Sequence, residues 1–267
     1  MVRVLLGALA LMAGLYLAAL VALAIAQRML IYPAPPLPRT GADAMPPGFA
    51  AVTLRTSDGL ALRAAYRAAA LGHAVLVFFH GNGSSIDESA VATALLGRQG
   101  YGLLLVEYRG YRGNPGKPSE QGLYRDGQAA LAWLGEHGVP AEQTVLIGNS
   151  LGSGVATELA AHAPVAGLVL ISGFTSLPDV ARGHFSWLPT QLLRDRYDNR
   201  AKLGGIAAPV LLLHGTADTL VPAAHARTLA AAAPGATLEL VPHYGHELAF
   251  QPEAQVRTLA WLARLQP

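Results

Sequence analysis

Three residues far apart in the chain, Ser150, Asp218 and His246, have side chains that together can activate a serine hydroxyl. A serine hydroxyl is a poor nucleophile unless a base takes its proton, and a histidine can be that base. A carboxylate behind the imidazole fixes its tautomer and stabilises the imidazolium that forms. We therefore predict that Ser150 is a nucleophile, that His246 is its base and that Asp218 orients the base.

The neighbours of Ser150 favour the same interpretation. The stretch LIGNSLGSG places Gly148 and Gly152 two positions before and after the serine, which gives the pattern G-x-S-x-G. A serine that projects from a sharp, strained turn needs small neighbours, so these glycines predict a nucleophile elbow. A tetrahedral intermediate also needs donors for its oxyanion. The backbone N–H groups of Leu151, at the start of the expected helix, and of Asn82 are the predicted oxyanion hole.

Other polar residues compete for these roles. Ser150 itself could be an ordinary turn residue, although such a turn does not need glycines two positions before and after it. Asp195 and Asp198 precede the strand expected at 209–213, whereas the preferred carboxylate follows it. His243 lies closer to its strand end than the preferred histidine and is expected to be too close to reach the serine. Three further residues are expected to be structural or solvated rather than catalytic: His80, bracing the oxyanion loop, His214 and Glu247.

The elements that must position these residues follow from the apolar pattern. Residues 52–69 alternate apolar and polar side chains around Asp58-Gly59, which predicts a β-hairpin. Six short apolar runs are typical of strands buried on both faces: 74–79, 102–108, 144–149, 167–172, 209–215 and 237–242. Segments with helical spacing lie between them, at roughly 87–99, 119–137, 151–162, 222–233 and 252–264.

Strands that alternate with helices predict an α/β fold, here with a mostly parallel eight-stranded sheet and helices on both faces. Ligands of such sheets bind beyond the carboxyl ends of the strands. Four candidate sites each come shortly after an expected strand: residues 80–83, Ser150, Asp218 and His246. They are therefore expected to lie together at one edge of the sheet.

A long apolar segment precedes this pattern, with no charged residue from 4 to 26. As a helix it would be about 34 Å long, enough to cross a hydrocarbon core of about 30 Å. We predict that residues 1–27 are a single-pass membrane anchor. Arg3 and Arg28 flank it nearly equally, so the side of the membrane stays open. Ala24-Ile25-Ala26 resembles a cleavage site, which leaves a cleaved signal peptide as the alternative.

Residues 28–49 are rich in proline and are predicted to be a linker between the membrane and a catalytic domain at 50–267. Within that domain, residues 174–205 are long for a connection between two strands. Their apolar residues predict either a small lid over the pocket or a satellite helix that packs on the edge of the domain. These residues are Phe174, Phe185, Trp187, Leu188, Leu192 and Leu193.

Composition narrows the possible functions. The chain has no cysteine, which excludes disulfides, thiolate metal sites and a cysteine nucleophile. Its net charge is +2 and it has no basic block, so we expect no nucleic-acid partner. It contains no HExxH sequence, clustered carboxylates or phosphate-binding loop, so neither metal nor cofactor is predicted. The apolar segment makes the membrane an expected partner, and protein partners stay open.

Several motifs resemble the α/β-hydrolase fold superfamily over roughly residues 51–264. Within it, the chain is similar to the membrane-anchored α/β-hydrolase-domain-containing serine hydrolases. The motifs that carry this similarity are QRMLIYP, HGNG, EYRGYRGNPGKPSEQGLYRD, GNSLGSG, SGFTS and HGTAD. Asn149 departs from the pattern of many members, which have His before the serine. The resemblance implies a hydrolase of acyl esters or thioesters, often lipid-like.

We therefore predict a serine esterase, thioesterase or lipase that works through an acyl-enzyme intermediate. An acyltransferase or peptidase that uses the same three residues is one alternative. A membrane-tethered binding module on an inactive hydrolase scaffold is another, and it predicts that Asp218 or His246 lies far from Ser150.

Overall fold

The computed structural model describes residues 1–36 and 44–265. A single eight-stranded sheet lies at its centre, in the order β1-β2-β4-β3-β5-β6-β7-β8. The strands are β1 (Ala50–Arg55), β2 (Ala61–Arg67), β3 (Val75–Phe79), β4 (Gly102–Val106), β5 (Thr144–Asn149), β6 (Gly167–Ile171), β7 (Val210–Gly215) and β8 (Thr237–Val241).

The sheet is antiparallel only at one edge. β1 and β2 form the predicted hairpin, and β2 also runs antiparallel to β4. Every pairing from β4 to β8 across the sheet is parallel. The prediction of an eight-stranded, mostly parallel sheet is therefore confirmed. All carboxyl ends of its parallel strands lie at the same edge, where a ligand site is expected.

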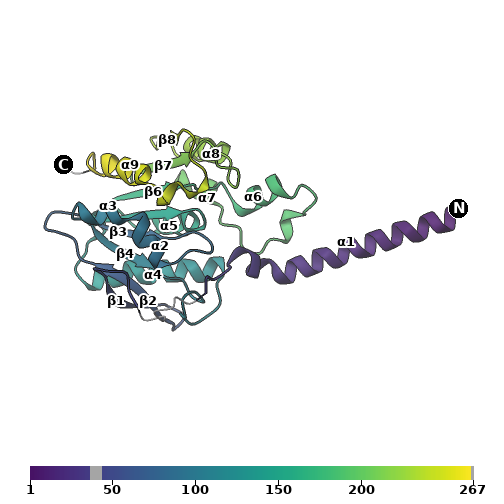
Figure 1. Cartoon of the computed structure of the whole chain (residues 1–267), viewed down its shortest axis with the longest axis horizontal. Coiled ribbons are helices and arrows are strands. Elements are labelled where there is room, and N and C mark those ends of the chain that lie inside the picture. Colours follow the sequence, from purple (N-terminus) through teal and green to yellow (C-terminus); the bar gives the residue numbers. More distant parts are fainter. Residues whose placement is uncertain (37–43, 266–267) are drawn as a thin grey trace.

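Helices cover both faces of the sheet (Figure 1). The α-helices of the described residues, including α1, which does not cover the sheet, are α1 (Val2–Ile31), α2 (Ile86–Ala92), α3 (Ala94–Arg98), α4 (Glu120–Glu136), α5 (Leu151–His162), α6 (Leu177–His184), α7 (Asn199–Leu203), α8 (Ala224–Ala232) and α9 (Pro252–Leu262). Short 3-10 helices occupy η1 (Ala141–Gln143), η2 (Thr190–Leu192) and η3 (His246–Phe250).

The continuous apolar character of the strands follows from burial on two sides. In β3, Val75, Val77 and Phe79 belong to the core shared with α4, α5, α7 and α8. Leu76 and Phe78 point to the other face and belong to the core shared with α2, α3 and α9. Successive strand side chains alternate between faces, so a strand covered on both faces needs an apolar residue at every position.

The helix expected at 87–99 is divided in two at Thr93. Gln255 of α9 reaches into the break, where its Oε1 accepts the Leu95 N–H at 2.7 Å. Its Nε2 donates to the Val91 carbonyl at 3.2 Å. A side chain distant in sequence thus satisfies the backbone groups that the interruption frees, which helical spacing alone does not reveal.

α1 projects away from the rest of the molecule (Figure 1). Among the helices that the structure describes, α1 alone is long and apolar enough to cross a membrane. The most apolar stretch of this helix has a mean hydropathy of 2.5, and none of that stretch is buried inside the molecule. An N-terminal signal sequence would meet the same criteria. The helix continues to Ile31, four residues beyond the predicted end of the anchor.

The first residues of the predicted linker pack against the domain. The Arg28 guanidinium donates to both carboxylate oxygens of Asp195, at 2.9 and 3.1 Å. Tyr32 is 4% exposed, and its hydroxyl lies 3.0 Å from that of Tyr197. Part of the linker, residues 37–43, lies outside the described residues. The domain is thus joined to α1 by specific contacts.

Arg109, in the loop after β4, ties the hairpin to α4. Its Nε donates to Asp126 Oδ1 at 2.8 Å, and its backbone N–H donates to Asp126 Oδ2 at 3.0 Å. Its two Nη atoms donate to Asp58 at 2.7 and 3.0 Å. Asp126 is 0% exposed, so its buried charge depends on Arg109 as a partner.

Replacing Arg109 with Met should lower the free energy of unfolding by about 3–5 kcal/mol, because a buried carboxylate is left without its cation. Arg125→Ala is the control: this arginine is 45% exposed and lies 3.4 Å from the same Asp58. Its loss should change stability by about 0.5 kcal/mol or less. Urea unfolding in detergent measures both. Equal effects of the two substitutions would contradict this account of Arg109.

Candidate active site

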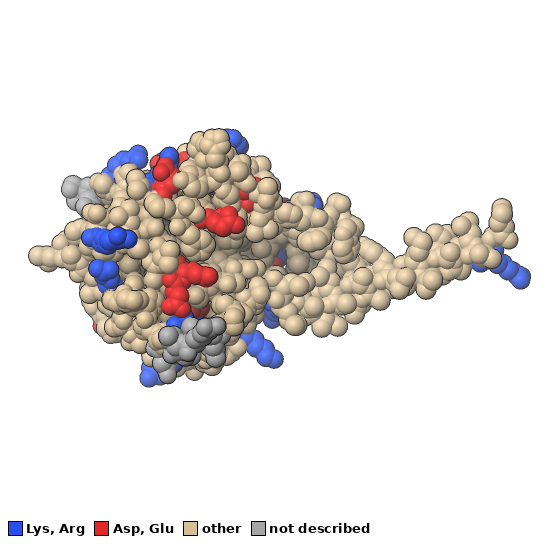
Figure 2. Space-filling model, viewed as in Figure 1, with Lys and Arg blue, Asp and Glu red and all other residues tan. Residues whose placement is uncertain are grey.

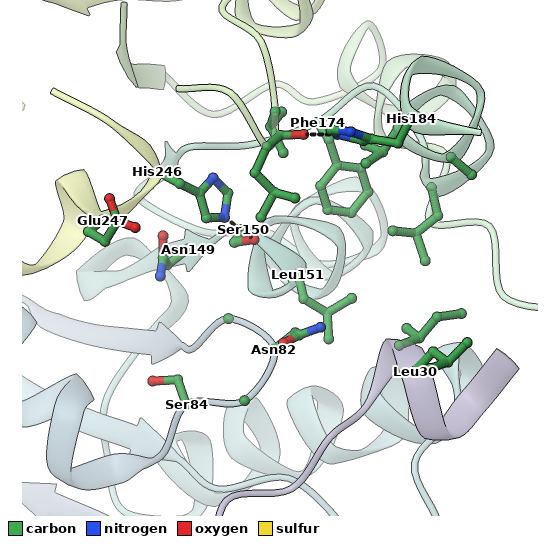
Figure 3. A pocket seen from close by; sticks show the side chains of 18 of the residues that line it. Leu30, Asn82, Ser84, Asn149, Ser150, Leu151, Phe174, His184, His246 and Glu247 are labelled. Carbon is green, nitrogen blue, oxygen red and sulfur yellow. Dashed lines mark hydrogen bonds between the residues drawn. The ribbon is translucent and has the colours of Figure 1, made fainter. Parts of the chain in front are cut away.

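The structure brings the three predicted residues into one hydrogen-bonded chain. Ser150 Oγ lies 2.8 Å from His246 Nε2, and His246 Nδ1 lies 2.8 Å from Asp218 Oδ2. Ser150 stands between β5 and α5, Asp218 follows β7, and His246 begins η3 after β8. Figure 3 shows the serine and the histidine facing each other beside the pocket. The carboxyl edge of the sheet thus gathers groups 96 and 28 residues apart.

Asp218 is held as a carboxylate. Its Oδ1 accepts the backbone N–H groups of Leu220 and Val221, at 3.0 and 2.8 Å. Burial alone raises the pKa of its carboxyl, but hydrogen bonds from two histidines, His214 and His246, and from a backbone N–H hold that pKa well below its usual range. The side chain is 0% exposed, so these donors replace the water that the charge has lost.

The charge of Asp218 decides which nitrogen of His246 carries the proton. An ionised carboxylate only accepts hydrogen bonds, so His246 Nδ1 is the donor. In the neutral imidazole Nε2 then has a free lone pair, and it accepts the Ser150 hydroxyl. The geometry therefore aligns the hydroxyl proton with a base.

Ser150 lies in a strained turn. Its φ is 49° and its ψ is −116°, although only glycine adopts positive φ at little cost. A Cβ at Gly148 would lie 2.5 Å from the Gly152 carbonyl oxygen, and one at Gly152 would lie 2.0 Å from the Phe79 carbonyl oxygen. Both positions predicted to form the elbow therefore exclude any side chain.

The loop that carries His246 also depends on a close backbone approach. A Cβ at Gly215 would lie 2.2 Å from the carbonyl oxygen of Tyr244. His243 is exposed, and its backbone N–H donates to Thr216 Oγ1 at 3.2 Å. The structure thus brings His246, and not its sequence neighbour, to the serine.

His80 and Glu107 fix the loop that contains Asn82. Both ring nitrogens of His80 face acceptors: Gly81 O at 2.8 Å and Glu107 Oε1 at 3.0 Å. Glu107 Oε2 accepts the Ile86 N–H at 3.1 Å. All of these groups are buried. The expected bracing role of His80 agrees with this geometry, whereas Glu107 was not singled out from the sequence.

The two predicted oxyanion donors lie beside the serine. Leu151 is the first residue of α5, where a backbone N–H has no acceptor within the helix. Asn82 and Leu151 both line the same cavity as Ser150, and Figure 3 shows them next to each other. Asn149 Oδ1 also lies here, buried and without a hydrogen-bond partner among the described residues.

A cavity of about 730 Å³ opens over Ser150. α6 forms one wall through Leu177, Val180, Ala181 and His184, and Phe185 directly after the helix extends this wall. This helix belongs to the insertion, residues 174–205, for which the sequence left open a lid or a satellite helix. His184 Nε2 donates to the Leu220 carbonyl at 2.8 Å, which connects α6 to the loop after Asp218 (Figure 3). The insertion therefore lies over the cavity and lines it.

The end of α1 forms another wall. Leu30 and Ile31 line the cavity together with residues of the insertion and of η3. Sequence reasoning assigned these two residues to the linker and missed their place in the site. The only signal was that they continue the helix without a break, which does not reveal where the helix end packs.

The remaining candidates have structural positions. Asp195 pairs with Arg28, and Asp198 caps α7 by accepting the Ala201 N–H at 3.1 Å. His214 is 1% exposed at the end of β7. Glu247 is exposed at the rim of the cavity. In the part of the chain that the structure describes, no three His, Cys, Asp or Glu residues are grouped to hold a metal ion.

Known proteins are similar to this chain in sequence. The sequence profile of the α/β hydrolase fold family matches residues 74–206. An uncharacterized protein of Mycobacterium tuberculosis is 42% identical over 228 residues, which are 82% of this chain and 80% of that protein. The human alpha/beta hydrolase domain-containing protein 17B is 33% identical over 156 residues, which are 58% of this chain and 53% of that protein.

Solved structures agree at the level of the fold. The Pyrococcus furiosus esterase Pf2001 superposes with a TM-score of 0.68 at 19% identity, over 88% of this chain and 100% of that one. The esterase domain of a Rhodothermus marinus protein gives a TM-score of 0.62 at 21% identity, over 81% and 98%. With the family profile and the sequence relatives, these similarities identify the chain as a member of the α/β-hydrolase fold family.

Proposed function

We propose that this protein is a membrane-anchored serine hydrolase that cleaves acyl esters or thioesters through an acyl-enzyme intermediate. The observation that carries the proposal is the chain of two 2.8 Å contacts that joins Ser150, His246 and Asp218 beneath an apolar cavity. An inactive binding scaffold has no need of this alignment, since it requires neither a base for the serine nor a carboxylate behind that base.

The reaction follows from the proton positions. His246 Nε2 takes the hydroxyl proton while Ser150 Oγ forms a bond to the acyl carbon. The backbone N–H groups of Leu151 and Asn82 stabilise the oxyanion. As the bond to the leaving group breaks, His246 returns the proton to the departing oxygen or sulfur. Water then attacks the acyl-enzyme by the same route, which releases the acid and regenerates the serine.

The cavity supports an acyl substrate with a long apolar part. Its volume of about 730 Å³ is within the range of small-molecule sites. Leu30, Val180, Phe185 and Phe250 contribute to its lining, so most of the surface offers hydrocarbon contact. Two structurally similar proteins are named esterases, which agrees with this class of substrate.

We further propose that α1 is retained as a single-pass anchor. The Ala24-Ile25-Ala26 sequence lies inside an unbroken helix that continues to Ile31. The Ala24 carbonyl accepts a hydrogen bond from Gln27 Nε2 at 2.9 Å, across the point where cleavage would fall. An anchor also accounts for a helix surface that is apolar and exposed along most of its length.

A fluorophosphonate probe should label the wild-type protein and should not label Ser150→Ala, because the probe needs the activated hydroxyl. Ser84→Ala is the matched control: Ser84 lines the same cavity but has no histidine bonded to its hydroxyl. It should label like the wild type in a gel assay. Label that persists on Ser150→Ala would exclude this serine as the nucleophile.

Asp218→Asn should lower kcat by roughly 10⁴-fold. The N–H groups of Leu220 and Val221 face Oδ1, so an asparagine keeps its carbonyl there and turns its NH₂ toward His246. The imidazole must then accept at Nδ1 and carry its proton on Nε2, where it faces Ser150 as a donor instead of a base.

The matched control for this substitution is Asp198→Asn, since asparagine also caps helices well. It should leave the hydrolysis of a soluble ester unchanged. A loss of kcat under tenfold in Asp218→Asn would contradict the proposed role of the carboxylate.

Activity should rise from acid to neutral pH, because acylation needs the neutral imidazole of His246. Since the pKa of Asp218 is held below its usual range, this carboxyl stays ionised while the histidine gains its proton. The acid limb of kcat/KM should therefore reflect one proton. Rates of soluble-ester hydrolysis between about pH 5 and 8 test this. A flat profile would exclude His246 as the base.

A further inference from the structure

α1 contains two polar side chains between Arg3 and Arg28, and both bond to the insertion. The Tyr16 hydroxyl donates to the Trp187 carbonyl at 3.0 Å. Gln27 donates through Nε2 to the Leu192 carbonyl at 3.3 Å and accepts the Arg194 N–H through Oε1 at 2.8 Å. Both polar side chains of this otherwise apolar helix therefore form hydrogen bonds with the same neighbouring segment.

These contacts extend along one face of the helix. Between Tyr16 and Gln27, the residues Leu20, Leu23 and Ala24 line a small apolar gap. The far side of this gap is formed by Leu188, Pro189, Leu192 and Leu193 of the insertion. The insertion therefore runs beside about 16 Å of α1, at 1.5 Å of rise per residue. Figure 1 shows the segment after α6 reaching away from the domain toward α1.

The insertion tip, residues 185–193, contains no charged residue. Phe185 is 50% exposed, Trp187 is 53% exposed and Leu192 is 45% exposed. Such a concentration of large apolar side chains on one short segment marks a contact surface. The neighbouring α1 has no charged side chain along its middle on the face that Figure 2 shows.

The position of the insertion tip along α1 indicates what covers this surface. Residues 16–27 make up about half of the apolar run of α1, so a hydrocarbon core that surrounds the anchor also surrounds whatever packs on this half. Backbone carbonyls at that depth need internal donors. Tyr16 and Gln27 supply them to Trp187 and Leu192.

We propose that the insertion tip is a second membrane-embedded element, immersed beside α1 in one leaflet of a lipid bilayer. The inference rests on the proposed anchor. Phe185 and Leu193 of the tip and Leu30 of α1 also line the cavity over Ser150. The mouth of the cavity thus opens among lipid acyl chains, and the substrate is an acyl group that enters laterally from the leaflet.

The positions of nearby charges agree with this immersion. Arg194 and Arg196 follow the tip directly and are exposed, and Arg28 is 46% exposed where α1 meets the domain. Arginines just outside a hydrophobic segment are favoured at the level of lipid headgroups. The tip, the helix and these arginines together define one membrane-facing end of the molecule.

Site-directed spin labelling tests the proposal, because the chain has no native cysteine. Single cysteines are placed at Trp187 and Leu192 of the tip, at Leu17 of α1 and at Leu71 of the domain. Leu17 is 61% exposed and Leu71 is 102% exposed. The labelled full-length proteins are reconstituted in phosphatidylcholine–phosphatidylglycerol vesicles. Accessibility to oxygen and to a water-soluble nickel chelate then reports depth.

Labels at Trp187 and Leu192 should resemble the label at Leu17, with high oxygen and low nickel accessibility, and should differ from the label at Leu71. Tip labels that match Leu71 while Leu17 is in lipid would overturn the immersion of the tip and leave the anchor intact. If the label at Leu17 were also exposed to water, both the proposed anchor and the proposed immersion of the tip would be overturned. Thermal unfolding verifies that each variant is folded, independently of activity.

Native fluorescence gives a second measurement without a label. Lipids with brominated acyl chains should quench the wild-type protein more than Trp187→Phe, since Trp133 and Trp261 lie in the domain. Equal quenching of the two proteins would contradict immersion of the tip.

Discussion

The buried charge of Asp218 is the constraint on which the rest of the site depends. Its hydrogen bonds keep it ionised, its ionisation puts the proton of His246 on Nδ1, and that tautomer leaves Nε2 free for Ser150. Besides the two histidines, the backbone supplies donors, because the chain turns after β7 and points two N–H groups at one oxygen. Gly215 lets the loop of His246 approach closely enough to complete the arrangement.

The parallel sheet explains why such distant residues meet. β5, β7 and β8 end at the same edge, so the residues after them become neighbours. The strained backbone of Ser150 is maintained by burial around it, since Gly152 packs directly on the carbonyl of Phe79. Glu107, buried after β4, fixes the adjacent loop through His80. The site is thus an extension of the sheet, and the strands that carry it are buried in the two cores.

The sequence predicts structure well where a pattern of a few neighbouring residues reflects a local steric requirement. Continuous apolar runs predicted the strands, and the glycines around Ser150 predicted its turn, because both signals lie within a few residues. It predicts less well where one segment packs on another distant in sequence. Gln255 bonds to the backbone at the break between α2 and α3, and Leu30 lines the cavity, yet neither residue differs locally from an ordinary helix residue. Such contacts depend on tertiary packing, which periodicity does not encode.

The junction between α1 and the domain has a kinetic consequence. Arg28 donates two hydrogen bonds to Asp195, and Asp195 also accepts the Glu120 N–H at the start of α4. A domain held by these contacts is not joined to α1 by a free tether. If α1 is the membrane anchor proposed above, the site moves only with that anchor and meets the proposed lipid substrate by lateral diffusion in two dimensions. Under the same proposal, the surface density of the substrate in the leaflet, rather than its bulk concentration, determines how often the substrate meets Ser150.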